Sequence, residues 1–127
     1  MGEKVEVSGG CHCGNVRFKA FVEPNPEVWD CNCSICSKFA FLHLFVPHED
    51  FTLLSVPGAQ TSYRFGRKEA DHLFCKTCGV KSYYQPRSHP EAWSINLHCL
   101  DNSDAVRASI IPFDGKNWET SAIAKGL

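Results

Sequence analysis

The segment FCKTCG (74–79) places two cysteines, Cys75 and Cys78, at the spacing that lets both sulfurs reach one metal ion. Gly79, which follows them, permits the tight positive-φ turn that such a knuckle makes beneath the ion. A knuckle of this kind supplies two ligands, and a tetrahedral zinc site has four. The segment therefore predicts a second cysteine pair elsewhere in the chain.

A matching pair lies near the start of the chain, in GGCHCG (9–14), where Cys11 and Cys13 again precede a glycine. Four thiolates from the two pairs would close a tetrahedral site, and a closed zinc site is structural because it leaves no position for a substrate. Such a site would hold the N-terminal strand against the middle of the chain. In a small domain it contributes on the order of 10 kcal/mol of apparent folding free energy.

A third group, DCNCSIC (30–36), contains Cys31, Cys33 and Cys36. Three ligands with a vacant position are the catalytic pattern of zinc, and the vacant position could bind a substrate thiol as its thiolate. Spacing alone also allows sequential grouping, in which the first four cysteines share one ion. Cys99 or a histidine could instead complete the second site and make both sites structural. A pair of redox thiols is a further alternative, although the segment lacks a thioredoxin-like βαβ setting.

The rest of the sequence is that of a globular chain. Its 127 residues suit one domain, which we expect to span 1–127, and its 43% hydrophobic and 21% charged content argues against extended disorder. The net charge of −1, with scattered basic residues, predicts no binding to nucleic acid or to an acidic membrane surface.

Targeting signals are also missing from the sequence pattern. No apolar run approaches the roughly 20 residues of a membrane span, and the first ten residues lack the apolar segment of a secretory signal. We therefore expect a cytoplasmic protein, with the nucleus as a second compartment. In such a reducing environment, closely spaced cysteines indicate metal binding rather than disulfides.

Short apolar stretches between turn residues predict a mainly β fold. NVRFKAFV (15–22) alternates, which is typical of a half-buried strand. One face carries Val16, Phe18, Ala20 and Val22, and the other carries Asn15, Arg17 and Lys19. FLHLFV (41–46) is continuously apolar and indicates a strand covered on both faces. Only 115–126 is typical of a helix, with a further helical turn expected near 32–38. The other strands are expected over 51–55, 61–66, 71–75, 80–85 and 93–100.

No serine–histidine–aspartate, paired-carboxylate or phosphate-loop pattern is present. A general base could come from Asp30 or from a histidine, and Lys38 and Arg87 are candidates, by residue type, for binding an anion. Cys99 is expected to be a small buried apolar residue. Three histidines fall in apolar strand patterns and are expected to be structural: His43, His72 and His98.

Three motifs in a fixed order resemble one family. GGCHCGNVRF (9–18), DCNCSIC (30–36) and FCKTCGVKSYY (74–84) are similar to the glutathione-dependent formaldehyde-activating enzyme family, which also includes centromere protein V. The resemblance covers roughly residues 8–114, and INLHCLD (95–101) looks closest to the centromere protein V branch.

The resemblance implies an Mss4-like fold of several small antiparallel β-sheets, with one short C-terminal helix and two Zn²⁺ ions per chain. It assigns the structural zinc to Cys11, Cys13, Cys75 and Cys78, and the second zinc to Cys31, Cys33 and Cys36.

In the family's enzymes the second zinc is the proposed catalytic site. The reaction joins formaldehyde and glutathione to form S-(hydroxymethyl)glutathione and is classed as a carbon–sulfur lyase. For this chain the resemblance therefore predicts a zinc-dependent carbon–sulfur lyase acting on glutathione or small-thiol adducts, with Cys31, Cys33 and Cys36 as catalytic residues. The alternative is a non-catalytic zinc-binding module, related to centromere protein V, that meets a protein partner. An enzyme would have a concave basic pocket at the three cysteines, whereas a module would have an exposed apolar patch.

Overall fold

The alternating segment around residue 18 forms the middle strand of a small antiparallel sheet. In the computed structural model, which describes residues 3–55 and 57–127, this sheet has the order β1 (Val5–Gly10), β2 (Arg17–Val22), β5 (Phe51–Leu53). Phe18, Ala20 and Val22 of β2 are buried and the residues between them, including Phe21, are partly or fully exposed, as the alternation predicts.

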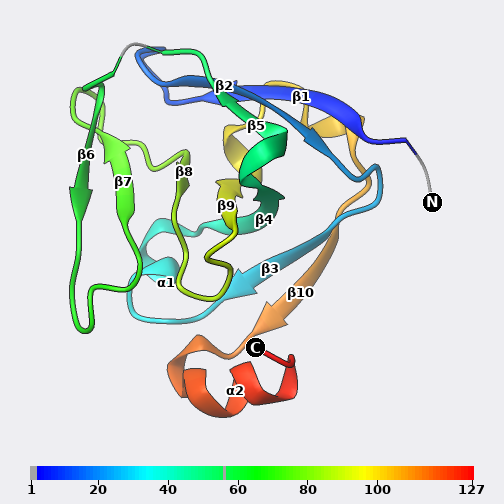
Figure 1. Cartoon of the computed structure of the whole chain (residues 1–127), viewed down its shortest axis with the longest axis vertical. Helices are drawn as coiled ribbons and strands as arrows, with labels where there is room; N and C mark the ends of the chain where they lie inside the picture. Colours follow the sequence, from blue (N-terminus) through cyan, green and yellow to red (C-terminus); the bar gives the residue numbers. More distant parts are fainter. Residues whose placement is uncertain (1–2, 56) are drawn as a thin grey trace.

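A five-stranded sheet lies across from it and carries most of the remaining strands (Figure 1). Neighbouring strands pair antiparallel with one exception, since β10 runs parallel to β3. The strand order is β10 (Ser109–Phe113), β3 (Glu27–Cys31), β4 (Leu42–Pro47), β9 (Ala92–Asn96) and β8 (Tyr83–Tyr84).

The third sheet is the hairpin of β6 (Gln60–Tyr63) and β7 (His72–Cys75), which stands beside β8 in Figure 1. Two short α-helices complete the fold: α1 (Cys36–Phe39) follows β3, and α2 (Trp118–Ala124) follows β10. The 3₁₀ turns are η1 (His48–Asp50), η2 (Leu97–Cys99), η3 (Ser103–Ala105) and η4 (Gly115–Asn117).

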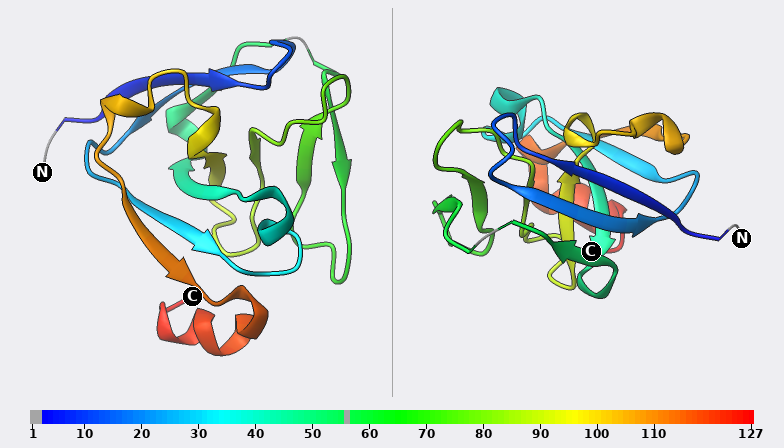
Figure 2. Two further views of the ribbon diagram at one scale, coloured as in Figure 1. Left: turned by 180° about the vertical axis from the view of Figure 1, so that it is seen from behind. Right: turned by 90° about the horizontal axis from the view of Figure 1, so that it is seen from above.

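The buried side chains of the core come mainly from the first two sheets, whose arrangement is seen in the two views of Figure 2. Phe18 is fully buried, and its ring stacks on Phe51 at 5.2 Å and meets Tyr83 edge-on at 5.8 Å. Leu44 and Ile95, on adjacent strands of the larger sheet, are buried to 2% and 0% exposure. Burial of such side chains stabilises the fold by about 1.5–3 kcal/mol each.

The structure confirms the predicted fold class, with small antiparallel sheets and one short C-terminal helix. That helix begins at Trp118 rather than at residue 115, because the preceding residues form a 3₁₀ turn. The strands β3 and β10, and their parallel pairing, were not indicated by the sequence pattern. Within the described residues, no helix combines the length and apolarity needed to span a bilayer.

Candidate metal centres and the adjoining cavity

One group of cysteines joins the end of β1 to the end of β7. The sulfurs of Cys11, Cys13, Cys75 and Cys78 all lie within 4.8 Å of one another. Cys13 Sγ is 3.6 Å from both Cys11 Sγ and Cys75 Sγ. Tetrahedral coordination with metal–sulfur bonds of about 2.3 Å separates sulfurs by about 3.8 Å, so the four thiols fit one ion. We call this group the closed cluster.

The two halves of the closed cluster are built alike. The amide of Cys11 donates to the carbonyl of Val16 at 3.1 Å, and the amide of Cys75 donates to that of Val80 at 3.0 Å. The glycine after each pair has a positive φ, +86° and +79°, as predicted for knuckle turns.

Backbone amides also point at the sulfurs of this cluster. The amide of Val16 donates to Cys11 Sγ at 3.3 Å, and the amides of Thr77 and Cys78 donate to Cys75 Sγ at 3.4 Å. Such bonds favour the charged thiolate, which is the form that binds a metal ion.

The second group, which we call the open cluster, has three members. Cys31 ends β3, Cys36 begins α1, and Cys33 lies between them; their sulfurs also lie within 4.8 Å of one another. Among the described residues, no fourth cysteine, histidine or carboxylate joins this set, and Cys99 belongs to neither cluster. The pKa of the Cys33 thiol falls far below its ordinary value, because Cys31 and then Cys36 hydrogen-bond to it. The pKa values of Cys31 and Cys36 are raised, first of all because each hydrogen-bonds to another thiol of the cluster, so without an ion the negative charge of the cluster resides mainly on Cys33.

The parallel pairing of β10 with β3 brings the C-terminal segment over the open cluster. Asn32 accepts a bond from the Lys116 amide at 3.0 Å and donates to Asp114 at 3.1 Å. Gly115 is buried there, and a Cβ atom at this position would lie 2.4 Å from Cys31 Sγ and 2.8 Å from Cys33 Cβ. Only glycine lets the segment pack this closely against the sulfurs.

His43, on β4, lies beneath the open cluster and supports Cys36. Its Nε2 is 3.2 Å from Cys36 Sγ, and its Nδ1 is 2.8 Å from the hydroxyl of fully buried Ser94. Burial, followed by the charge of Lys81, lowers the pKa of His43 to about 3, so the ring is neutral. When Cys36 is a thiolate, as a metal ligand must be, its sulfur can only accept, so the ring proton resides on Nε2 and Nδ1 accepts from the Ser94 hydroxyl.

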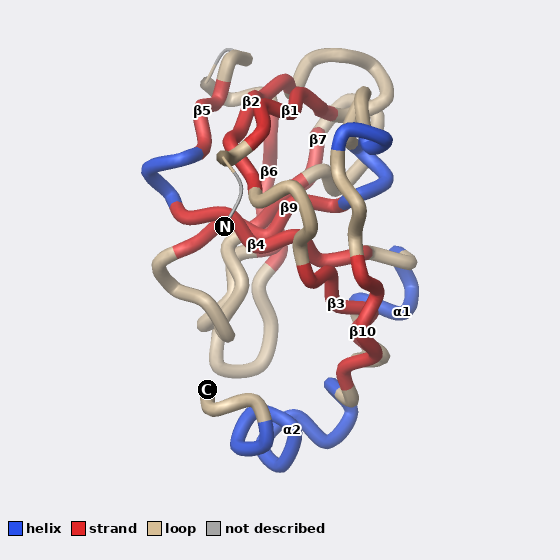
Figure 3. Tube along the Cα trace, turned by 90° about the vertical axis from the view of Figure 1, so that its right-hand side faces the viewer, coloured by secondary structure: helices blue, strands red, loops and turns tan. Residues whose placement is uncertain are grey.

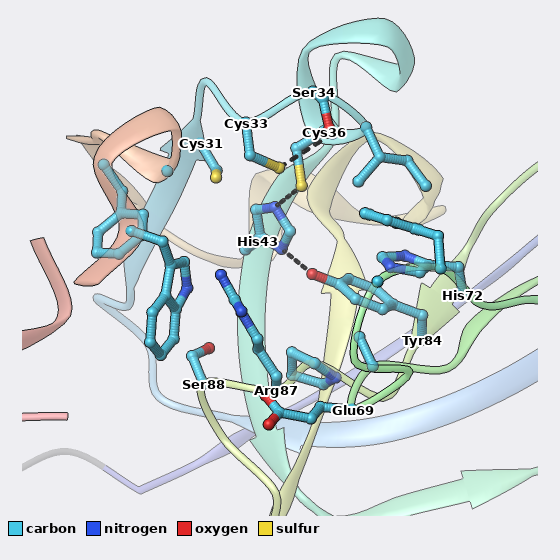
Figure 4. A pocket seen from close by; sticks show the side chains of 18 of the residues that line it. Cys31, Cys33, Ser34, Cys36, His43, Glu69, His72, Tyr84, Arg87 and Ser88 are labelled. Atoms are coloured by element: carbon cyan, nitrogen blue, oxygen red, sulfur yellow. Dashed lines mark hydrogen bonds between the residues drawn. The ribbon is translucent and has the colours of Figure 1, made fainter.

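A cavity of about 410 Å³ opens directly at the three cysteines. Figure 4 shows Cys31, Cys33 and Cys36 on one side of it and Arg87 extending toward them from the other. The aromatic side chains that line it come from five strands or loops and α2: Trp29, Phe45, Phe65, Tyr84, Phe113 and Trp118.

The cavity is also rich in positive charge. The guanidinium of Arg87 stacks over the Trp118 ring at 3.8 Å, and Glu69 is the acidic lining residue in the described part of the chain. The basic lining residues are Arg67, Lys68, Arg87 and Lys116. This arrangement favours an anionic ligand with an apolar portion.

The structure separates the candidates that the sequence left open. The cysteines gather in the interleaved arrangement, with the first and last pairs together, and not in sequential order. Arg87 lines the cavity, whereas Lys38 and Asp30 are exposed and lie outside its lining. His43, expected to be structural, does have both ring nitrogens bonded, but one partner is a sulfur of the open cluster. Trp118 and Gly115 were not recognised as site residues, because nothing in their local sequence marks them.

The fold and the two clusters define a class: a small β domain with one closed and one open cysteine centre, each able to hold a metal ion. The sequence profile of the family described as glutathione-dependent formaldehyde-activating enzyme matches residues 6–115. The chain belongs to that family.

Two individual proteins are also similar to this chain. A fission yeast protein from Schizosaccharomyces pombe, named as an uncharacterized lyase, is 25% identical over 95 residues, covering 72% of this chain. The matched region spans 66% of that protein's length. A crystal structure of a Rhodobacter sphaeroides protein superposes with a TM-score of 0.67 at 29% identity, covering 75% of this chain and 88% of the other.

Proposed function

We propose that the protein is a zinc-dependent carbon–sulfur lyase that acts on the hydroxymethyl adduct of a small anionic thiol, with S-(hydroxymethyl)glutathione as the first candidate. The observation that carries this proposal is the open cluster facing a cavity whose opposite wall presents Arg87. In this proposal Cys31, Cys33 and Cys36 are the catalytic ligand set, and the closed cluster is structural. The family membership and the lyase name of the yeast relative support the reaction class.

The donor set fits a zinc ion at both clusters, since thiolates in a tetrahedral arrangement are preferred zinc ligands. A zinc ion at the open cluster would supply a position that holds a thiol as thiolate or polarises a carbonyl oxygen. The chain's own residues do the rest. Arg87, stacked on Trp118, binds a carboxylate of the thiol substrate; the aromatic walls exclude water; His43 keeps Cys36 oriented.

The reaction joins a thiol and formaldehyde into a hydroxymethyl thioether: a carbon–sulfur bond forms, and the thiol proton is transferred to the former carbonyl oxygen. Because this adduct also forms without a catalyst, we infer that the protein contributes chiefly by positioning the two reactants. A cavity lined by aromatic rings and several basic side chains, with Arg87 facing the cysteines, is suited to that role. The basic concave site at the cysteines supports the enzyme over the non-catalytic interaction module.

We further propose that the whole chain, residues 1–127, acts as one domain. The family match ends at residue 115, but Trp118 of α2 still forms part of the cavity wall. Figure 3 shows α2 directly following β10 at one end of the molecule. The cavity is thus completed by residues beyond the matched region.

The test is the exchange rate between glutathione, formaldehyde and their adduct, measured by NMR with zinc-loaded protein. We expect acceleration over the protein-free reaction, and loss of that acceleration in Cys33→Ser. Folded protein with two zinc ions per chain that gives no acceleration would reject this substrate pair. Acceleration retained in Cys33→Ser would reject the open cluster as the reaction site.

A further inference from the structure

Lys81 is a buried cation that neither the motifs nor the proposed reaction uses. Its side chain is only 3% exposed, on the segment between the second knuckle and β8. In the described part of the chain no carboxylate lies within ion-pair distance of its ammonium. Lysine is rarely buried without an opposite charge, because removing the ammonium from water is costly. The compensating charge must therefore come from another kind of group.

The immediate surroundings of Lys81 stabilise a positive charge. The ammonium lies 3.8 Å from the centre of the Tyr84 ring, and 5.1 and 5.2 Å from those of Phe39 and Phe41. It donates a hydrogen bond of 2.7 Å to Nδ1 of His72. Burial, and then the charge of Lys81, lower the pKa of His72 to about 4, so that ring is a neutral acceptor. Three ring faces and one acceptor form a cage for a cation.

The cage shares its walls with the open cluster. Phe41 lies 4.6 Å from His43, ring to ring, and the Tyr84 hydroxyl is 3.4 Å from His43 Nδ1. His43 in turn contacts Cys36 Sγ. Burial lowers the pKa of Lys81 to about 8, while the negative charges of Cys36 and then Cys33 oppose that shift. Contacts from Lys81 through Phe41 and Tyr84 to His43, and from His43 to Cys36 Sγ, therefore place the open cluster behind one wall of the cage.

The formal charge that the open cluster would carry with an ion bound gives Lys81 a role. A divalent ion with three thiolates carries a formal charge of −1, and a fourth thiolate raises it to −2. In a half-buried site this added charge is costly unless a nearby cation offsets it. A neutral fourth ligand, such as water or imidazole, adds no charge and needs no such compensation.

We propose that Lys81 is a fixed counter-charge of the open cluster, which makes that cluster select an anionic thiolate over a neutral molecule as its fourth ligand. This inference rests on the proposed function for the presence of a divalent ion at the open cluster. A thiol bound there would lose its proton to the solvent, and an ion held by the three cysteines would supply the position for its sulfur. Lys81 does not touch the ligand and acts through the field of its charge.

The experiment uses protein loaded with Co²⁺, whose visible bands report ligand exchange at the open cluster. Two probes are titrated at one pH: glutathione, which binds as a thiolate, and imidazole, which binds as a neutral nitrogen donor. In Lys81→Met we expect glutathione affinity to fall about tenfold or more, from the loss of one unit charge at short range, with imidazole affinity unchanged. Lys81→Arg, which keeps the charge, should retain the preference.

Lys38→Met is the matched control, because Lys38 lies two residues after Cys36 but is exposed, so solvent screens its charge. It should leave both affinities unchanged. Equal losses for both probes in Lys81→Met, or no loss for glutathione, would overturn the inference. If Lys81→Met does not fold, Lys81→Gln, which keeps a hydrogen-bond donor toward His72, provides the same comparison. Absence of lyase activity with the charge selectivity intact would refute only the proposed function.

Discussion

The closed and open clusters use the same ligand chemistry but differ in what surrounds the sulfurs. The closed cluster is supported by backbone amides of its own two knuckles, all within five residues of a cysteine. The open cluster has one such bond, from the Cys36 amide to Cys33 Sγ at 3.4 Å, and depends otherwise on other elements: His43 on β4 and, farther along the chain, Arg87 and Gly115. In our proposal the locally supported cluster holds the fold together, and the cluster supported from other elements is shaped for a ligand.

The largest difference should appear when one cysteine is removed from each cluster. Cys78→Ser breaks the link between β1 and β7 and should unfold the domain, because a structural zinc contributes on the order of 10 kcal/mol. Cys33→Ser should leave the domain folded with one ion bound. Thermal melts and elemental analysis of both variants test this division, and superimposable melting curves would contradict it. Wild-type protein should contain two ions per chain.

The second-largest difference is expected from two glycine substitutions, one beside each cluster. Gly115→Ala would place a Cβ 2.4 Å from Cys31 Sγ, and we expect loss of the ion from the open cluster alone, in a folded protein. Gly10→Ala would place a Cβ 2.0 Å from the Val16 carbonyl, in the first knuckle, and should disrupt the closed cluster and the fold. Metal content and the far-ultraviolet circular dichroism spectrum of each variant distinguish the two effects. If Gly115→Ala retains two ions, the close packing of the C-terminal segment is not required.

A smaller effect is expected when the hydrogen bond between His43 and Cys36, beneath the open cluster, is removed. His43→Phe keeps a ring but removes the donor to Cys36, and such supporting hydrogen bonds change metal affinity by about 10–100-fold. Chelator competition should show weaker binding of one ion and unchanged binding of the other. His48→Phe is the control, because His48 is exposed and bonds to Gln85 instead. Equal weakening of both ions would indicate a general loss of stability rather than support of Cys36.

The smallest effect is expected from a substitution in the cavity wall, which should change substrate binding alone. Arg87→Met removes one charge-assisted bond to an anionic thiol and should raise KM for glutathione about fivefold to tenfold, with metal content and melting temperature unchanged. Arg107→Met, at an exposed arginine outside the cavity lining, should leave KM unchanged. An unaltered KM in Arg87→Met would remove Arg87 from substrate binding.

Local spacing determined how much could be predicted from the sequence. The knuckles, the positive φ of Gly79 and the alternating burial of β2 depend on neighbouring residues, and the structure confirms each of them. The parallel pairing of β10 with β3 depends on residues about 80 positions apart, so no local pattern indicates it. Lys81 lies in a segment typical of an ordinary strand, and its burial depends on packing against two distant rings, Phe39 and Phe41, as well as nearby Tyr84.

The position of Gly115 also has a consequence for how the protein is made. All seven cysteines of the two clusters lie within the first 78 residues, whereas the segment that covers the open cluster follows residue 113. At about 5–20 residues per second, the ribosome completes the closed set of ligands several seconds before that segment leaves it. The two sets of residues are therefore made in sequence: the four cysteines of the closed cluster can bind an ion during translation, whereas the cavity at the open cluster is completed only when the segment up to Trp118 has been made.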